Sequence, residues 1–249
     1  MARRVLRYSS VRHAGFIFLL PVLLGCRPKP PDLVTANHRE DLTATLQAVQ
    51  RRMHERFSSA RQLEESIALG DLERARTSAG VIAGLDEPEA LPEWQPYIAG
   101  IRETAHQIEF AATTVAAARS ATILGMRCAH CHVALEARVT FTVEPRPFDD
   151  QKRTPQMLAH QWAALQMWEG IIAPSDDRWL AGAVALTTVP INTVANVATP
   201  RLVDDLDDIA RIRRYGERAL TARSAAARVD LFGDILATCA HCHAALRDR

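Results

Sequence analysis

The sequence predicts an all-α fold. It is rich in Ala, Leu, Arg and Glu, and it contains few β-branched clusters and few Asn-Gly or Asp-Gly turns. Apolar residues near its start recur every three or four positions, so one face of a long helix is apolar. These residues are Leu42, Leu46, Val49, Met53, Phe57, Ala60, Leu63 and Ile67. The same plan then recurs along the chain, which predicts two tandem helical bundles.

Helix boundaries in the first half follow from residues that stop and cap helices. Gly70-Asp71 is expected to end the first helix and to cap a second helix over 72–85. Pro88, Pro92 and Pro96 mark a loop. The helical pattern then resumes and is expected to run to about Arg138.

The second half repeats this order. Met157 follows Met53 by 104 residues, and Pro174-Ser-Asp176 takes the place of the Gly70-Asp71 break. The segment Cys-Ala-His-Cys-His also occurs twice, 111 residues apart, so the second half carries extra residues in its 190–200 loop. An internal duplication explains this better than a coincidental Ala-rich similarity. The expected domains are 38–139 and 154–249, joined by a linker at 140–153.

The N-terminus has the layout of an export signal. A basic segment precedes a short apolar stretch at 14–25, which Pro21 interrupts and which falls short of the ~20 residues that span a bilayer. Residues 1–25 are therefore predicted to be a signal peptide rather than a membrane anchor. Leu23-Leu-Gly-Cys26 resembles a bacterial lipobox, which implies a lipid on Cys26 and a periplasmic location. A soluble periplasmic form is the alternative, and residues 26–37 are expected to be a stiff Pro-rich spacer.

Composition excludes one class of partner. The chain is 48% hydrophobic and 24% charged, with a formal net charge of +1. Nucleic-acid binding would require a clustered excess of Lys and Arg. We therefore expect no nucleic-acid partner.

The repeated pentapeptide carries the chemistry. Cys-x-x-Cys-His is the attachment signature of c-type haem. Positions i, i+3 and i+4 share one face of a helix, so two thiols can bond the haem while the histidine reaches iron. The sequence thus predicts two haem c groups, one on Cys128 and Cys131 and one on Cys239 and Cys242. The expected proximal iron ligands are His132 and His243.

Three other interpretations of these cysteines compete with haem attachment. A zinc site would require all four cysteines to converge from the two halves. A thioredoxin-like redox pair would require a βαβ context, which the sequence does not predict. A disulfide between positions i and i+3 of a continuous helix has poor geometry.

A helical unit that ends in a Cys-x-x-Cys-His helix resembles the class II c-type cytochromes, the cytochrome c′ and c556 group. The resemblance covers about 38–138 and 154–249, and it implies four-helix bundles. It also implies an electron carrier rather than an enzyme, acting with periplasmic or membrane redox proteins. Family members form dimers, so a homodimer is expected unless the tandem halves satisfy that interface internally. The family often has an aromatic residue and then Arg after the haem histidine; here Glu136 and Arg247 follow instead, so the two haems are expected to differ in electrostatic tuning.

The sixth iron ligand is expected on the first helix of each half, as the resemblance implies. Met53 is the candidate in the first half, and Met157 and His160 compete in the second; a methionine on an apolar helix face also serves as core packing. Six-coordinate iron favours electron transfer. A five-coordinate iron would instead make the protein a gas-binding or sensing haem protein, and a dihaem peroxidase is the weakest alternative. His130 and His241 are expected on the solvent side rather than on iron. Core packing, rather than an electron relay, is expected of Trp162, Trp168 and Trp179.

Overall fold

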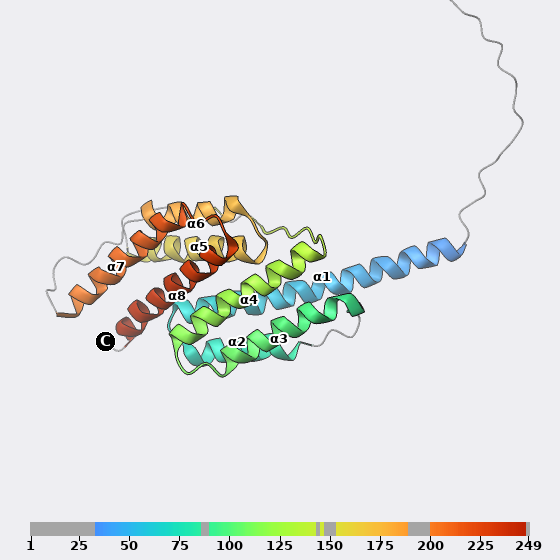
Figure 1. Ribbon diagram of the computed structural model, residues 1–249, viewed down its shortest axis with the longest axis horizontal. Helices are drawn as coiled ribbons and strands as arrows, with labels where there is room; N and C mark the ends of the chain where they lie inside the picture. The colour runs from blue at the N-terminus through green and yellow to red at the C-terminus, as the bar shows by residue number, and fades with distance from the viewer. Residues whose placement is uncertain (1–32, 86–89, 143–144, 147–152, 189–199, 248–249) are drawn as a thin grey trace, which may run out of the picture. The chain divides into compact units, whose positions relative to one another are not determined.

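The computed structural model describes residues 33–85, 90–142, 145–146, 153–188 and 200–247. Within these ranges the regular structure is entirely helical, so the predicted all-α class is confirmed (Figure 1). The predicted signal peptide and Cys26 lie outside the described residues. The first helix begins at Leu33, inside the range expected to be spacer. None of the described helices is both long and apolar enough to cross a membrane.

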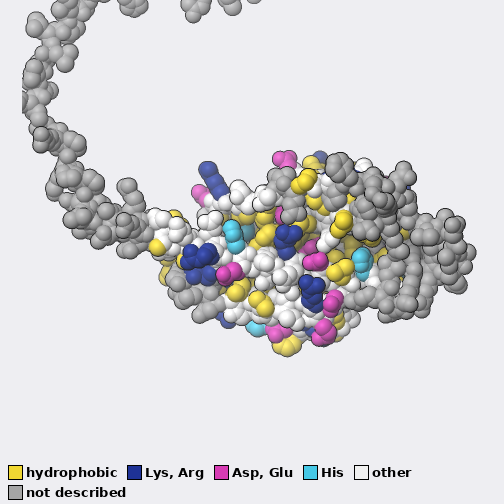
Figure 2. Space-filling view, turned by 180° about the vertical axis from the view of Figure 1, so that it is seen from behind, with side chains coloured by type: hydrophobic (Ala, Val, Ile, Leu, Met, Phe, Trp, Pro, Cys, Tyr) yellow, Lys and Arg dark blue, Asp and Glu magenta, His cyan; other side chains and the backbone are white. Residues whose placement is uncertain are grey.

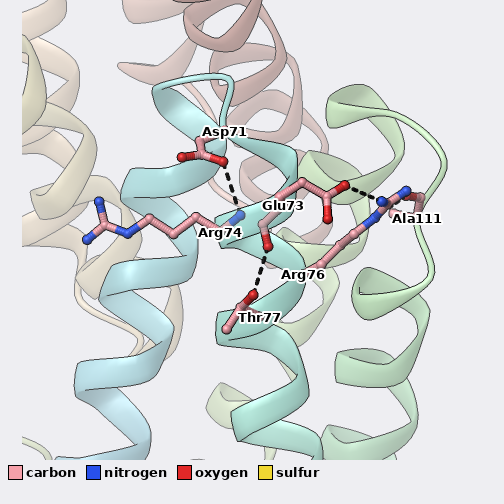
Figure 3. Close-up of polar contacts among 6 residues, drawn as sticks. All are labelled: Asp71, Glu73, Arg74, Arg76, Thr77 and Ala111. Carbon is pink, nitrogen blue, oxygen red and sulfur yellow. Dashed lines mark hydrogen bonds and ion pairs between the residues drawn. The ribbon is translucent and has the colours of Figure 1, made fainter.

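The described part of the first half contains four α-helices and one short 3-10 helix. These are α1 (Leu33–Ala68), α2 (Leu72–Gly84), η1 (Pro92–Trp94), α3 (Gln95–Glu109) and α4 (Thr114–Ala134). The predicted break after α1 is confirmed, because Gly70 has a φ of 70° and Asp71 caps α2. The Asp71 carboxylate accepts a hydrogen bond from the Arg74 backbone N–H at 3.1 Å (Figure 3).

The helical pattern that was expected to run to about Arg138 is divided into α3 and α4, and α4 ends at Ala134. The chain breaks between α3 and α4, and the hydroxyl of Thr113 caps α4 by accepting from the Ala116 N–H at 3.1 Å. Arg76 of α2 holds this break in place, because its guanidinium donates to the Ala111 carbonyl at 2.8 and 3.1 Å. The end of α4 comes early because Glu136 adopts a φ of 51°, a left-handed conformation that ends a helix.

The second half repeats the helix order of the first. Its helices are α5 (Arg153–Ile172), α6 (Asp176–Thr188), α7 (Pro200–Ala219) and α8 (Ala225–Arg247). Helices α2 and α6 have 13 residues each and begin at positions that correspond in the predicted repeat. Ser224 caps α8 as Thr113 caps α4, with its hydroxyl 3.2 Å from the Ala227 N–H. The repeated helix order expected from the sequence is therefore present.

Residues 1–44 and 45–249 form separate units. The structure describes only the start of α1 in the first unit. In the second unit, helices from both halves pack together: α4 contacts α8 and α5, and α5 contacts α8. Figure 1 shows α4 and α8 side by side. The sequence left open whether the halves pack against each other, and the structure joins them in one core.

The centre of this core contains two fully buried tryptophans, which confirms their predicted packing role. The Trp168 ring stacks on Phe232 with the ring centroids 6.1 Å apart. The Trp179 indole N–H donates to the Ala219 carbonyl at 2.8 Å, so its polar group is satisfied inside the core. On the outside, Figure 2 shows basic and acidic side chains interspersed over the described helices of that face.

Candidate functional site

The two Cys-x-x-Cys-His segments lie in the C-terminal parts of α4 and α8, the two helices that pack across the halves. All four of their cysteines are half-buried and none forms a disulfide. On continuous helix, positions i, i+3 and i+4 share one face. Each helix therefore presents two thiols and one imidazole together.

The first histidine is held by the other half of the chain. The Nδ1 atom of His132 lies 3.0 Å from the backbone carbonyl oxygen of Ile172, at the end of α5. A carbonyl oxygen only accepts, so Nδ1 carries the proton and donates it. Burial lowers the pKa of His132, which favours the neutral ring. Its Nε2 lone pair is then available to a metal, and the carbonyl fixes the ring orientation as in many metal-ligating histidines.

The first thiol of each segment interacts electrostatically with a buried ionisable residue of α1. Burial raises the pKa of Cys128 to about 11, and the positive charge of Arg56 opposes this shift. Burial raises the pKa of Cys239 to about 12, and the negative charge of Glu64 adds to the shift. Arg56 is 6% exposed and Glu64 5% exposed.

These raised pKa values bear on the competing interpretations of the cysteines. A reactive redox thiol requires a lowered pKa, because the thiolate is the nucleophile. The first cysteine of each segment is instead protonated at neutral pH. Among the described residues, no group of three or more His, Cys, Asp or Glu side chains gathers as a metal site. The four cysteines therefore do not converge as a zinc site requires.

The candidate sixth ligands lie on α1 and α5. Met53 is half-buried, one helical turn before Arg56, the residue whose charge acts on Cys128. Met157 and His160 are half-buried on α5; Met157 corresponds to Met53 in the repeat, and His160 lies one turn later. These three remain candidates by position.

A cavity of about 450 Å³ lies between α1 and α5. Glu64 and Glu65 form part of its α1 wall, and Gln161 and Trp162 form part of its α5 wall. The Gln161 side-chain amide donates to the Glu65 carboxylate at 3.2 Å, which ties the two walls together. The cavity therefore joins the two halves and reaches the buried carboxyl group beside Cys239.

Sequence reasoning placed His130 and His241 on the solvent side, and both are exposed. It missed the partner of His241: the Nδ1 atom lies 2.7 Å from a carboxylate oxygen of Asp208, which is 3% exposed. It also missed Arg56, Glu64 and the Ile172 carbonyl. For Arg56 and Glu64, the only available signal in the sequence was their spacing, which places both on one stripe of a long helix.

The charges that the sequence singled out have a smaller role. Glu136 is exposed at the end of α4. The side chain of Arg247 lies outside the described residues. The buried ionisable groups that act on the first cysteines are Arg56 and Glu64; when Glu64 is ionised, their signs are the reverse of the order expected from Glu136 and Arg247.

Comparisons with protein-family models, with curated proteins and with solved structures gave no significant match.

Proposed function

We propose that this protein is a dihaem c-type cytochrome that transfers electrons on the periplasmic side of a bacterial membrane. The observation that carries the proposal is that thiols outside any disulfide lie on the same helix face as an oriented imidazole. Two helices each present a Cys-x-x-Cys-His face, the thiols are free of disulfides, and the His132 ring is held through Nδ1. This donor set fits covalent haem and fits neither a redox thiol pair nor a zinc site.

The residues that would hold each haem follow from the two segments. Cys128 and Cys131 would bond one haem, and Cys239 and Cys242 the other. His132 and His243 would each supply one iron ligand. Haem bound there supplies one-electron exchange at iron. The protein contributes attachment, burial and nearby charge, which set the potential of each site.

Each half would then be a haem bundle like those of the class II c-type cytochromes. The contact between the tandem halves would take the place of the interface that those cytochromes form between two chains. The predicted signal peptide and lipidated Cys26 would place the protein at a membrane surface. Its partners would be periplasmic or membrane redox proteins, and catalysis is not part of the proposed role.

The sixth ligand decides between electron transfer and gas binding. With Met53, and with Met157 or His160, on iron, both haems would be six-coordinate and low-spin. A methionine ligand would raise the potential and a second histidine would lower it. The optical spectrum of the reduced protein tests this: low-spin bands for both haems support electron transfer. High-spin bands with rapid CO binding would replace it with gas binding.

The attachment sites are tested by producing the full chain in a bacterium that exports it and matures c-type cytochromes. The pyridine haemochrome assay should then give two haems per chain. Replacing Cys128 and Cys131 together with Ser should halve this value. The exposed residue between them supplies the control, because His130→Ala should leave two haems. An unaltered chain without covalent haem would refute the proposal.

A further inference from the structure

The carboxyl group of Glu64 is a buried acid that attachment and ligation do not use. The residue is 5% exposed, yet it lines the cavity between α1 and α5. That cavity is also lined by the exposed residues Arg61 and Gln62, so it is open to water. Glu64 thus combines a desolvated position with a route for protons from solvent.

Glu64 belongs to the first half, but its charge acts on the second cysteine pair. Besides burial, the negative charge of Glu64 raises the pKa of Cys239, and Cys242 and Asp208 add to this shift. The loss of solvation raises the pKa of Glu64 itself to about 8, Glu65 adds to the shift and Arg61 opposes it. The α5 wall of the cavity contributes Leu158, Gln161, Trp162 and Leu165, none of which titrates.

The first cysteine pair has a different neighbour. Arg56 is buried on the same helix, two turns before Glu64, and its charge acts on Cys128. A guanidinium stays protonated throughout the physiological range. The charge next to the first pair is therefore fixed, whereas the charge next to the second pair depends on pH.

We propose that Glu64 takes up a proton when the centre on Cys239 and Cys242 is reduced and releases it on oxidation, whereas the centre on Cys128 and Cys131 exchanges electrons without this proton. The proposal rests on the proposed function. On reduction, one electron would arrive from a redox protein, or from a chemical reductant in the assay, and the haem iron held at that centre would pass from Fe(III) to Fe(II). One proton passes from solvent to the Glu64 carboxylate, because the added electron makes the site more negative. Oxidation reverses both transfers.

The test is a potentiometric titration of the haem-loaded full chain, followed optically from pH 6 to pH 10. We expect two one-electron waves. The midpoint potential of one wave should fall as the pH rises near pH 8, by up to about 59 mV per pH unit. This slope corresponds to a tenfold decrease in the equilibrium constant for adding one electron. The other wave should not change with pH. Replacing Cys239 and Cys242 together with Ser should remove the pH-dependent wave and leave the other.

Variants at the carboxyl positions complete the test. Glu64→Gln should abolish the pH dependence, and Glu64→Asp should retain it with a shifted midpoint. Glu65→Gln is the matched control, because this carboxylate lines the same cavity and is not fully buried. It should keep a pH-dependent wave, with the midpoint of the dependence moved to lower pH because Glu65 no longer adds to the raised pKa of Glu64.

The proposal is overturned if both waves are independent of pH, if the dependence survives in Glu64→Gln, or if it belongs to the centre on Cys128 and Cys131. A chain that carries two haems and gives one of these results keeps its proposed function and loses only the proton coupling. A chain without covalent haem in the same preparation overturns both.

Discussion

Gly125 of α4 is the residue at which the contact between the two halves can be tested by a single methyl group. A Cβ built there would lie 2.6 Å from Cζ3 of Trp168 and 3.1 Å from Cγ2 of Ile171, both on α5. Non-bonded carbon atoms prefer about 3.5–4.0 Å, so Gly125→Ala must displace a fully buried ring by about 1 Å. Overpacking of this kind costs about 1–3 kcal/mol.

Gly233→Ala is the matched control, because Gly233 lies within the other Cys-x-x-Cys-His helix. Its added Cβ would lie 3.5 Å from the Thr122 hydroxyl, an ordinary contact. The helix propensity of alanine is about 1 kcal/mol more favourable than that of glycine in either helix, so this contribution cancels when the two variants are compared. Thermal unfolding followed by circular dichroism should place Gly125→Ala about 1–3 kcal/mol below Gly233→Ala, at about 2–4 °C in Tm for each kcal/mol. Equal stability of the two variants would refute the packing of α4 against α5.

Three further outcomes test separate parts of the structure. Asp71→Ala removes the cap of α2 and should lower the free energy of unfolding by about 1 kcal/mol in urea titrations, with Asp71→Asn near the unaltered value. Trp179→Phe leaves the Ala219 carbonyl without its indole donor and should cost about 1–3 kcal/mol in the same assay; no loss would mean that water replaces the indole. Because the pKa of Glu64 is raised from 4.5 to about 8, the folded state binds this proton more tightly, so its stabilising contribution is complete below pH 4.5 and is lost as the pH rises to about 8. As the pH rises through this window, the free energy of unfolding of the unaltered chain should fall by about 1.4 kcal/mol per pH unit relative to that of Glu64→Gln. Parallel pH profiles of the two proteins would contradict the burial of the Glu64 carboxyl group.

The local features of the fold could be predicted from the sequence because neighbouring residues determine them. Gly70 and Asp71 end one helix and cap the next with groups that are adjacent in the chain. The break before α4 was missed because Ala-rich sequence continues through it. The only local signal was Thr113, and the guanidinium that stabilises the break comes from Arg76 on another helix.

The candidate site, too, could be predicted from the sequence only in part. The cysteines and histidines are visible as a motif because helical spacing alone places them on one face. The Ile172 carbonyl, Arg56 and Glu64 reach the two segments only through packing between helices that are distant in sequence. The expected difference in electrostatic tuning was based on Glu136 and Arg247, which are close to the motifs in the sequence. Burial decides which charges act strongly, because exposed charges are screened by water.

The most direct test of the central claim is mass spectrometry of the mature, exported chain, intact and after proteolysis. Two covalent haems should be found, one on the peptide that contains Cys128, Cys131 and His132 and one on the peptide that contains Cys239, Cys242 and His243. Peptides of unmodified mass, from a chain that was exported by cells competent to mature other c-type cytochromes, would contradict the account.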